Sequence, residues 1–247
     1  MKFIVLILNK IRNIIEKILK NLLPRKKLNS HLSSFEKYKN DCLDKSFNNF
    51  KKYFNQAVFI SNHRLQIDFS IRKAIELNEN YTNEICLEFG VYKGNTINYL
   101  SKFVKKIYGF DTFTGLTEDW IGGTVNHLKE RYTTYGKLPK VPSNVQLIVG
   151  DIRKTLEPFL VKNNSKVFFI NFDLDTYEST KFALSKVKKN FTSNTILYFD
   201  EFYDYAGWET GEYKAFKEEI EEDENFSFKY LAFAKDLTAV TICVNKL

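Results

Sequence analysis

The spacing of apolar residues divides the chain into regions with different predicted structure. Within residues 4–23 apolar positions recur every three or four residues, with lysines and asparagines on the opposite face, which predicts an amphipathic helix. Pro24 and the basic residues after it end this helix. Residues 28–60 are polar and rich in Asn, Lys and Phe, so we expect a helical or irregular connection there. Residues 64–77 are again helical in period.

From residue 84 onward, short apolar runs alternate with segments of helical length. The runs are EICLEFG, KKIYGFD, VQLIVGD, KVFFINFD and NTILYFD. Such runs, separated by helices, are typical of a parallel sheet with helices on both faces. FSFKYLAFA and LTAVTICV, joined by only Lys235 and Asp236, instead predict an antiparallel hairpin at the sheet edge. We therefore expect one α/β domain over residues 61–247, preceded by the basic helix (1–27) and the connection (28–60).

The charge is distributed unevenly between these regions. Residues 1–27 hold eight basic residues and one acidic residue, which accounts for the whole formal net charge of +7. The rest of the chain is balanced, so we expect no binding of nucleic acid. A basic amphipathic helix is suited to an anionic membrane surface, but its apolar stripe is equally suited to packing on its own domain or on a second subunit. Both alternatives stay open, as does a homo-oligomer.

The cysteines and the start of the chain bear on location. Cys42, Cys86 and Cys243 form an odd set without CxxC spacing, and two of them lie in apolar runs, which fits a reducing cytoplasm. The opening MKFIVLIL is interrupted by polar residues before a signal-peptide core is complete. We expect a cytoplasmic protein, with peripheral contact at the inner face of the membrane as an option through residues 1–27.

Acidic residues mark the ends of the predicted strands. Four of the five runs end in an acid, and an acid also precedes the first glycine of EFGVYKGNT; these residues are Asp111, Asp151, Asp173, Asp200 and Glu88. In an open α/β sheet the ligand binds at the carboxyl ends of the strands. Gly90 and Gly94 match neither the P-loop GxxxxGK[ST] nor the dinucleotide fingerprint GxGxxG. A nucleoside without phosphates therefore fits better than ATP or NAD, and a nicotinamide-dependent oxidoreductase is disfavoured.

Four segments carry a resemblance to a known family. In order, they are EFGVYKGNT, YGFDTFTGLTEDW, NFDLDTYEST and FDEFYDYAGWETGEYKAF. Over residues 60–247 the chain resembles the class I S-adenosylmethionine-dependent methyltransferases, and more narrowly the metal-dependent sugar O-methyltransferases related to macrocin O-methyltransferase. The resemblance implies a Rossmann-like, seven-stranded, mostly parallel sheet whose last two strands form the antiparallel hairpin. It also implies S-adenosylmethionine as cofactor.

The resemblance implies cofactor contacts at the ends of the first strands. The two glycines would approach the methionine part closely, with Glu88 near its amino group, whereas the alternative for them is a tight turn without a ligand. Asp111 would bind the ribose hydroxyls. Phe113 would lie near the adenine, and Asp151 with Ile152 near its exocyclic amine. The expected cofactor-binding residues are Glu88, Gly90, Val91, Gly94, Asp111, Thr112, Phe113, Asp151, Ile152 and Asp173.

The resemblance also implies a divalent cation, Mg²⁺, bound by Asp173, Asp200 and Glu201. Carboxylate oxygens are ligands that Mg²⁺ accepts. Relatives usually have Asp or Asn where Glu201 stands, so its direct coordination is open; for Asp175 and Glu201 the alternative is capping a helix or pairing with a basic residue. The candidates for the base are Asp173 and His127, which lies in the loop where acceptors bind in this fold.

Three aromatic residues near the acids, Tyr177, Tyr205 and Trp208, suit the mixed apolar and hydroxyl surface of a sugar. Packing equally explains Tyr177. The leading hypothesis is a Mg²⁺-assisted O-methyltransferase that methylates a saccharide hydroxyl, on a nucleotide sugar, a glycolipid or a surface polysaccharide, with a role in polysaccharide biosynthesis. The alternatives are the same chemistry on a phenolic or other small metabolite, and an inactive methyltransferase-like subunit that binds a partner.

Overall fold

The computed structural model describes residues 32–78, 84–120 and 130–247. The chain divides into two compact units, residues 1–37 and 38–247. Helix α2 (Ser34–Phe54) begins with reciprocal hydrogen bonds between Ser33 and Glu36, in which each backbone N–H donates to the other's side chain. The helix predicted for residues 4–23, and the membrane contact expected of residues 1–27, lie outside the described residues.

The second unit is built on one eight-stranded sheet, in the order β1-β7-β8-β6-β5-β2-β3-β4. Its strands are β1 (Val58–Ile60), β2 (Ile85–Phe89), β3 (Ile107–Asp111), β4 (Val145–Val149), β5 (Val167–Phe172), β6 (Phe191–Phe199), β7 (Phe226–Ala234) and β8 (Val240–Lys246). All pairings are parallel except those of β8 with β6 and β7. The predicted Rossmann-like fold with a C-terminal antiparallel hairpin is confirmed.

The sheet has one strand more than the seven expected. Strand β1 pairs with β7 in parallel, and the Ile60 carbonyl accepts a hydrogen bond from the Lys235 N–H. Its three residues are β-branched or aromatic, which favours a strand, but the run is too short for a period to show in the sequence. The hairpin loop is also longer than predicted, because β8 begins only at Val240.

Residues 38–60 belong to the compact unit and are not a connection outside it. Cys42 and Phe50 of α2 are buried in the same core as the sheet. The Phe50 ring lies within 6.0 Å, between centroids, of six other rings; these belong to Phe202, Tyr203, Trp208, Tyr213, Tyr230 and Phe233. The polar composition of this segment concealed its single buried stripe.

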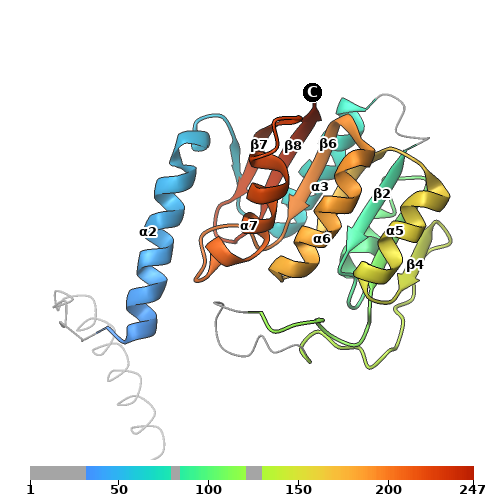
Figure 1. Ribbon diagram of the computed structural model, residues 1–247, viewed down its shortest axis with the longest axis horizontal. Coiled ribbons are helices and arrows are strands. Elements are labelled where there is room, and N and C mark those ends of the chain that lie inside the picture. Colours follow the sequence, from blue (N-terminus) through green and yellow to red (C-terminus); the bar gives the residue numbers. More distant parts are fainter. Residues whose placement is uncertain (1–31, 79–83, 121–129) are drawn as a thin grey trace, which may run out of the picture. The chain divides into compact units, whose positions relative to one another are not determined.

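Helices cover both faces of the sheet (Figure 1). On one face lie α5 (Ile152–Asn163), α6 (Tyr177–Val187) and α7 (Glu212–Phe216), and on the other α3 (His63–Leu77) and α4 (Asn95–Leu100). Neighbouring strand residues separate accordingly, since Leu87 belongs to the first core cluster and Cys86 to the second. No helix in the described part of the chain is long and apolar enough to cross a membrane.

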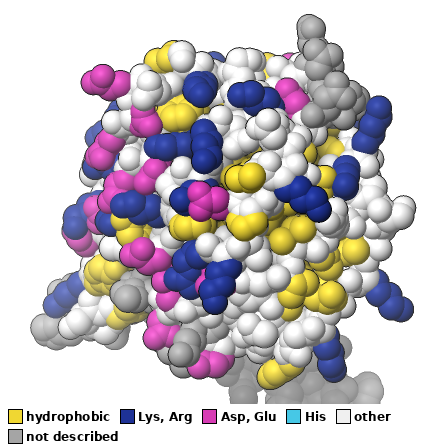
Figure 2. Space-filling model, turned by 45° about the vertical axis from the view of Figure 1, so that its right-hand side comes forward, with side chains coloured by type: hydrophobic (Ala, Val, Ile, Leu, Met, Phe, Trp, Pro, Cys, Tyr) yellow, Lys and Arg dark blue, Asp and Glu magenta, His cyan; other side chains and the backbone are white. Residues whose placement is uncertain are grey.

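One surface of the molecule is shown in Figure 2, with the right-hand side of Figure 1 turned forward. Acidic and basic side chains lie close together over its left half, and apolar side chains gather toward the right. Among the described residues on this face, basic groups are therefore mixed with other kinds. The absence of a nucleic-acid partner stays a prediction.

Candidate active site

A cavity of about 240 Å³ opens at the carboxyl ends of the central strands. Its wall includes seven of the residues expected in the site, namely Gly90, Asp111, Thr112, Ile152, Asp173, Asp200 and Glu201. These residues follow β2, β3, β4, β5 and β6, so the sheet edge brings together positions that are up to 111 residues apart. The location is the one that parallel α/β sheets use for ligands.

At the end of β2 the backbone turns tightly beside β5. Gly90 has a φ of +88°, and a Cβ there would lie 1.8 Å from the Asp173 carbonyl oxygen, so no other residue fits. The Asp111 carboxylate accepts the N–H groups of Val91 (2.8 Å) and Tyr92 (2.7 Å) on one oxygen and that of Phe113 (2.6 Å) on the other. Asp111 therefore fixes the glycine turn while it lines the cavity.

Glu88 lies in β2, fully buried between Gly109 of β3 and Asn171 of β5. Burial raises its pKa well above the usual range, and the Asn171 side chain and the Ile97 N–H offset this only in part. Neither carboxylate oxygen makes a hydrogen bond of good geometry within the described residues. A buried acid is usually paired with a hydrogen-bond donor or a cation, and within the described residues Glu88 has no such hydrogen bond.

Two residues expected to contact the cofactor have structural tasks. Gly94, with a φ of +80°, precedes α4, and a Cβ there would lie 2.9 Å from Pro139 Cβ. Asp151 caps α5 and accepts the Arg153 N–H (2.9 Å) and its guanidinium (2.7 Å), which holds the pKa of Asp151 below its usual value. Neither lines the cavity, whereas Gly150 does.

Three aromatic expectations require correction. Phe113 is fully buried in the core and absent from the cavity wall. Trp208 is 2% exposed, and its indole N–H donates to the Cys42 carbonyl. The Tyr177 hydroxyl donates to Glu218 (2.6 Å) and accepts from Lys181 (2.9 Å), outside the cavity. Packing and surface ion pairs explain these positions.

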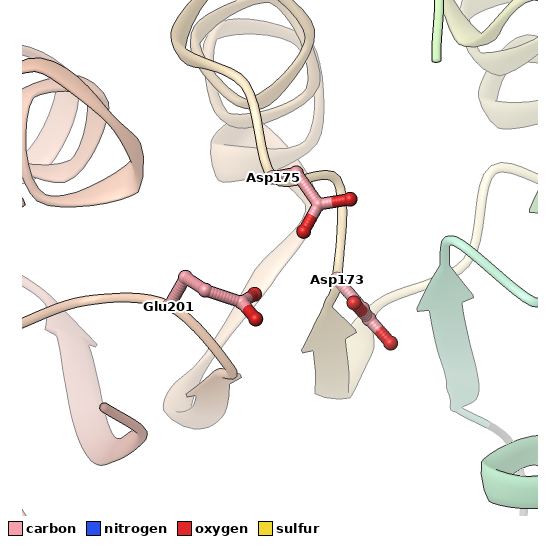
Figure 3. A group of neighbouring side chains, drawn as sticks. All are labelled: Asp173, Asp175 and Glu201. Carbon is pink, nitrogen blue, oxygen red and sulfur yellow. The ribbon is translucent and has the colours of Figure 1, made fainter. Parts of the chain in front are cut away.

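Three carboxyl groups meet at the reacting end of the cavity (Figure 3). One oxygen each of Asp173, Asp175 and Glu201 lies within 4.8 Å of the other two. Asp173 follows β5, Asp175 lies in the loop before α6 with a φ of +61°, and Glu201 reaches toward both from the loop after β6. The structure thus brings Asp175 into the set where Asp200 was expected.

The electrostatics of this cluster favour a cation. Burial raises the pKa of Asp173 well above its usual range, and the carboxylates of Asp200 and Asp175 raise it further. Burial and Asp200 raise the pKa of Asp175 to about 7, and burial and the same neighbours raise that of Glu201. Within the described residues Glu201 Oε2 has no hydrogen-bond partner. Hard oxygen donors with uncompensated charge fit Mg²⁺, whose charge would reverse these shifts.

Asp200 lines the same cavity but is held by other side chains. Its Oδ1 accepts from the Tyr198 hydroxyl (3.1 Å) and lies 2.8 Å from His63 Nε2. This hydrogen bond raises the pKa of His63, so the ring N–H donates to the carboxylate. His63 is the first residue of α3, and the sequence contained no local signal for its role. His127, the other expected base, lies outside the described residues.

Two further groups lie beside the cluster, of which Tyr205 was expected and Glu212 was not. Glu212, the first residue of α7, is fully buried, and one of its oxygens accepts the Leu174 N–H at 3.3 Å. The Tyr205 hydroxyl is buried without a hydrogen-bond partner in the described part of the chain, and its ring lies 6.1 Å from that of Trp120. Tyr205 therefore stays a candidate for contact with an acceptor.

Comparison with known proteins places the chain among methyltransferases. A family model of a methyltransferase domain matches residues 87–202, which contain the glycine turn and the acids after β3, β5 and β6. Curated protein sequences gave no match.

Several solved structures share the fold. The calicheamicin methyltransferase CalS11 is 23% identical over 72% of this chain and 77% of its own, with a TM-score of 0.58. An apo structure of CalS11, described as a TDP-rhamnose 3'-O-methyltransferase, is 24% identical over 88% and 98%, with a TM-score of 0.51. The O-methyltransferase NovP is 13% identical over 73% and 79%, with a TM-score of 0.52.

The resemblance to methyltransferases that the four motifs indicated is thereby confirmed for residues 87–202, whereas the narrower resemblance to metal-dependent sugar O-methyltransferases stays a prediction. The domain match covers the cavity and its glycine turn, and the solved structures agree in fold over most of the chain. By these comparisons, this chain contains a methyltransferase-like domain over residues 87–202 and shares the fold of solved methyltransferases.

Proposed function

We propose that the protein methylates a hydroxyl oxygen of a saccharide, with the help of a divalent cation. The observation that carries the proposal is the meeting of Asp173, Asp175 and Glu201 inside the cavity of a methyltransferase domain. Such a site suits an oxygen acceptor, because an alcohol is a poor nucleophile until it loses its proton and a bound cation lowers the pKa of that hydroxyl.

The first half of the cavity fits the cofactor. Gly90 permits close approach of a ligand to the backbone, and the Asp111 carboxylate stands at the wall where ribose hydroxyls are expected. Leu116 and Ile152 provide apolar wall for a flat ring. Glu88 is fully buried and is not part of the cavity wall, so its contact with the ammonium group of the methionine part stays a prediction. When bound, S-adenosylmethionine would supply a sulfonium methyl group that a hydroxyl oxygen attacks in line, with S-adenosylhomocysteine as the leaving group.

The second half of the cavity fits a cation and a base. Asp173, Asp175 and Glu201 would hold Mg²⁺, which when bound lowers the pKa of an acceptor hydroxyl. The proton of that hydroxyl must pass to a base at the cavity wall. Asp173 was predicted for this role, and Asp175 lies at the same wall.

Support for a saccharide comes from the wall and from a structural relative. Tyr92 and Tyr132 line the cavity, with ring centroids 5.7 Å apart, and offer apolar faces beside carboxylates that accept hydroxyl groups. CalS11, one of the proteins with this fold, is described as a methyltransferase of TDP-rhamnose. Phenolic acceptors share the apolar part of this argument and form the alternative.

The test measures the transfer of label from S-adenosylmethionine, labelled in its methyl group, to a panel of nucleotide sugars and catechols, with Mg²⁺ or with EDTA. We expect Mg²⁺-dependent labelling of a sugar hydroxyl that Asp173→Asn abolishes. Labelling of catechols alone would redirect the proposal to small phenolic metabolites. Equal rates in EDTA would show that the reaction needs no divalent cation. Binding of S-adenosylhomocysteine without methyl transfer to any acceptor would favour an inactive binding subunit.

A further inference from the structure

Glu212 is a fully buried acid that the proposed chemistry does not use. It begins α7, a helix of only five residues, and lies 38 positions from the loop that it contacts. Burying a carboxylate is costly unless donors compensate for the lost water. The nearby Asp175 carboxylate raises the pKa of Glu212 further, because like charges repel. The neighbouring acids therefore do not stabilise Glu212 in this position.

What compensates Glu212 is backbone. The Leu174 N–H donates to Glu212 Oε1 at 3.3 Å, whereas Oε2 has no hydrogen-bond partner within the described residues. The Glu201 N–H lies near enough to lower the pKa of Glu212 against the effect of burial. Leu174 separates Asp173 from Asp175, and Glu201 carries the third carboxyl of the cluster. One side chain therefore bonds to the backbone of the β5 loop and lies beside that of the β6 loop, the two loops that supply the cluster.

The loop after β5 needs this support. Asp175 has a φ of +61°, and directly after it the Thr176 N–H donates to the Leu174 carbonyl at 2.6 Å, which closes a very tight turn. Such conformations persist only where surrounding contacts hold them. Among the described residues, the set whose oxygens converge on one point is Asp173, Asp175 and Glu201, without Glu212.

We propose that Glu212 is a positioning residue that joins the β5 and β6 loops, so that Asp173, Asp175 and Glu201 converge on one cation. The inference rests on the proposed function, because it concerns a divalent cation between these loops. Its role is as a hydrogen-bond acceptor for backbone N–H groups, and an amide oxygen can replace a carboxylate in that role.

The test compares Mn²⁺ binding, followed by the paramagnetic resonance of free Mn²⁺, in the full chain and three variants. Glu212→Ala is expected to weaken Mn²⁺ affinity by about 10- to 100-fold, the range for residues that orient metal ligands. Glu212→Gln, which keeps the acceptor, is expected to recover most of that loss. Glu222→Ala, an exposed acid just beyond α7, serves as the matched control and is expected to match wild type.

Binding of S-adenosylhomocysteine without metal is measured on the same samples. It is expected to be unchanged in every variant, because the Asp111 end of the cavity does not contact Glu212. Equal Mn²⁺ affinity in wild type and Glu212→Ala would overturn the inference and leave the proposed function standing. If the wild-type protein binds S-adenosylhomocysteine but no Mn²⁺, both the positioning role of Glu212 and the proposed cation site are contradicted.

The Gln variant also distinguishes an acceptor from a charge. A loss in Glu212→Gln as large as that in Glu212→Ala would overturn the positioning role, since it would show that the negative charge itself attracts the cation. If Glu212→Ala does not fold, as shown by circular dichroism, the Gln variant alone decides. Retention of Mn²⁺ affinity within about tenfold of wild type supports the acceptor role, and a larger loss contradicts it.

Discussion

Both ends of the cavity have acids at the ends of strands, but the charges of these acids are compensated in different ways. Asp111 is satisfied by three backbone N–H groups, so its loop is complete without a ligand. Asp173, Asp175 and Glu201 face one another, with raised pKa values and an unpaired oxygen. The first end is organised by the chain itself. At the second end the acids are only partly compensated within the described residues, where Arg131 lowers the pKa of Asp175.

Asp175→Asn is expected to have the largest effect on the difference between the two ends. We expect the rate of methyl transfer to fall by about 10²- to 10⁴-fold, because the change removes a cation ligand or the base. The affinity for S-adenosylhomocysteine, measured by calorimetry without metal, should stay near that of wild type. A parallel loss of cofactor affinity would show that the two ends are not separate.

The converse change is Asp111→Ala. It removes an acceptor of three backbone hydrogen bonds, and each bond to a charged group contributes about 1.5–3 kcal/mol. We expect the affinity for S-adenosylhomocysteine to fall by at least about 100-fold. This corresponds to the loss of two such hydrogen bonds at the lower limit of about 1.5 kcal/mol each. Mn²⁺ binding should persist in this variant. Unchanged cofactor affinity would contradict the assignment of Asp111.

The fold and much of the cavity were predictable, because their signals are local. Strand runs with terminal acids placed Asp111, Asp173, Asp200 and Glu201 at one edge, and Gly90 followed from the turn beside them. These positions depend on period and on the geometry of parallel sheets.

The remaining positions depend on distant partners. His63 and Glu212 act on residues 137 and 38 positions away, so no neighbouring letters reveal them. Aromatic residues near acids are ambiguous for a different reason. The same composition gives a cavity wall at Tyr132 and a core residue at Trp208, and only packing against α2 decides between them.

The pH dependence of stability should differ between the cation-free and cation-bound protein. The pKa of Asp175 rises from its usual 3.8 to about 7 on folding, so the folded protein keeps a proton that the unfolded chain releases. This contribution to stability is complete below about pH 4 and is lost as the pH rises through about 7. In EDTA we expect the melting temperature to fall between about pH 5 and pH 8, by an amount equivalent to at most a few kcal/mol.

Mg²⁺ should restore the melting temperature at pH 8, and Asp175→Asn should flatten the slope in EDTA. His63, whose pKa is also raised by its bond to Asp200, contributes with the same sign and leaves a residual slope. A melting temperature that rises with pH in EDTA would contradict the burial of uncompensated acids at this end.

The smallest expected effect is that of His63→Ala. Asp200 keeps the Tyr198 hydroxyl, and the His63 side chain is 43% exposed, so the loss of one hydrogen bond should lower the methylation rate by less than about tenfold. His63→Gln, which keeps a donor, should lie nearer to wild type. A rate as low as that of Asp175→Asn would make His63 part of the catalytic group.

The most direct measurement is calorimetric titration of the wild-type protein at pH 6.5, first with S-adenosylhomocysteine and then with Mg²⁺, in buffers of different ionisation enthalpy. We predict binding of S-adenosylhomocysteine without metal, and Mg²⁺ heats that depend on the buffer because the clustered carboxyls release protons. Absence of S-adenosylhomocysteine binding would contradict the account. Mg²⁺ heats that are absent or independent of the buffer would remove the cation from the reacting end.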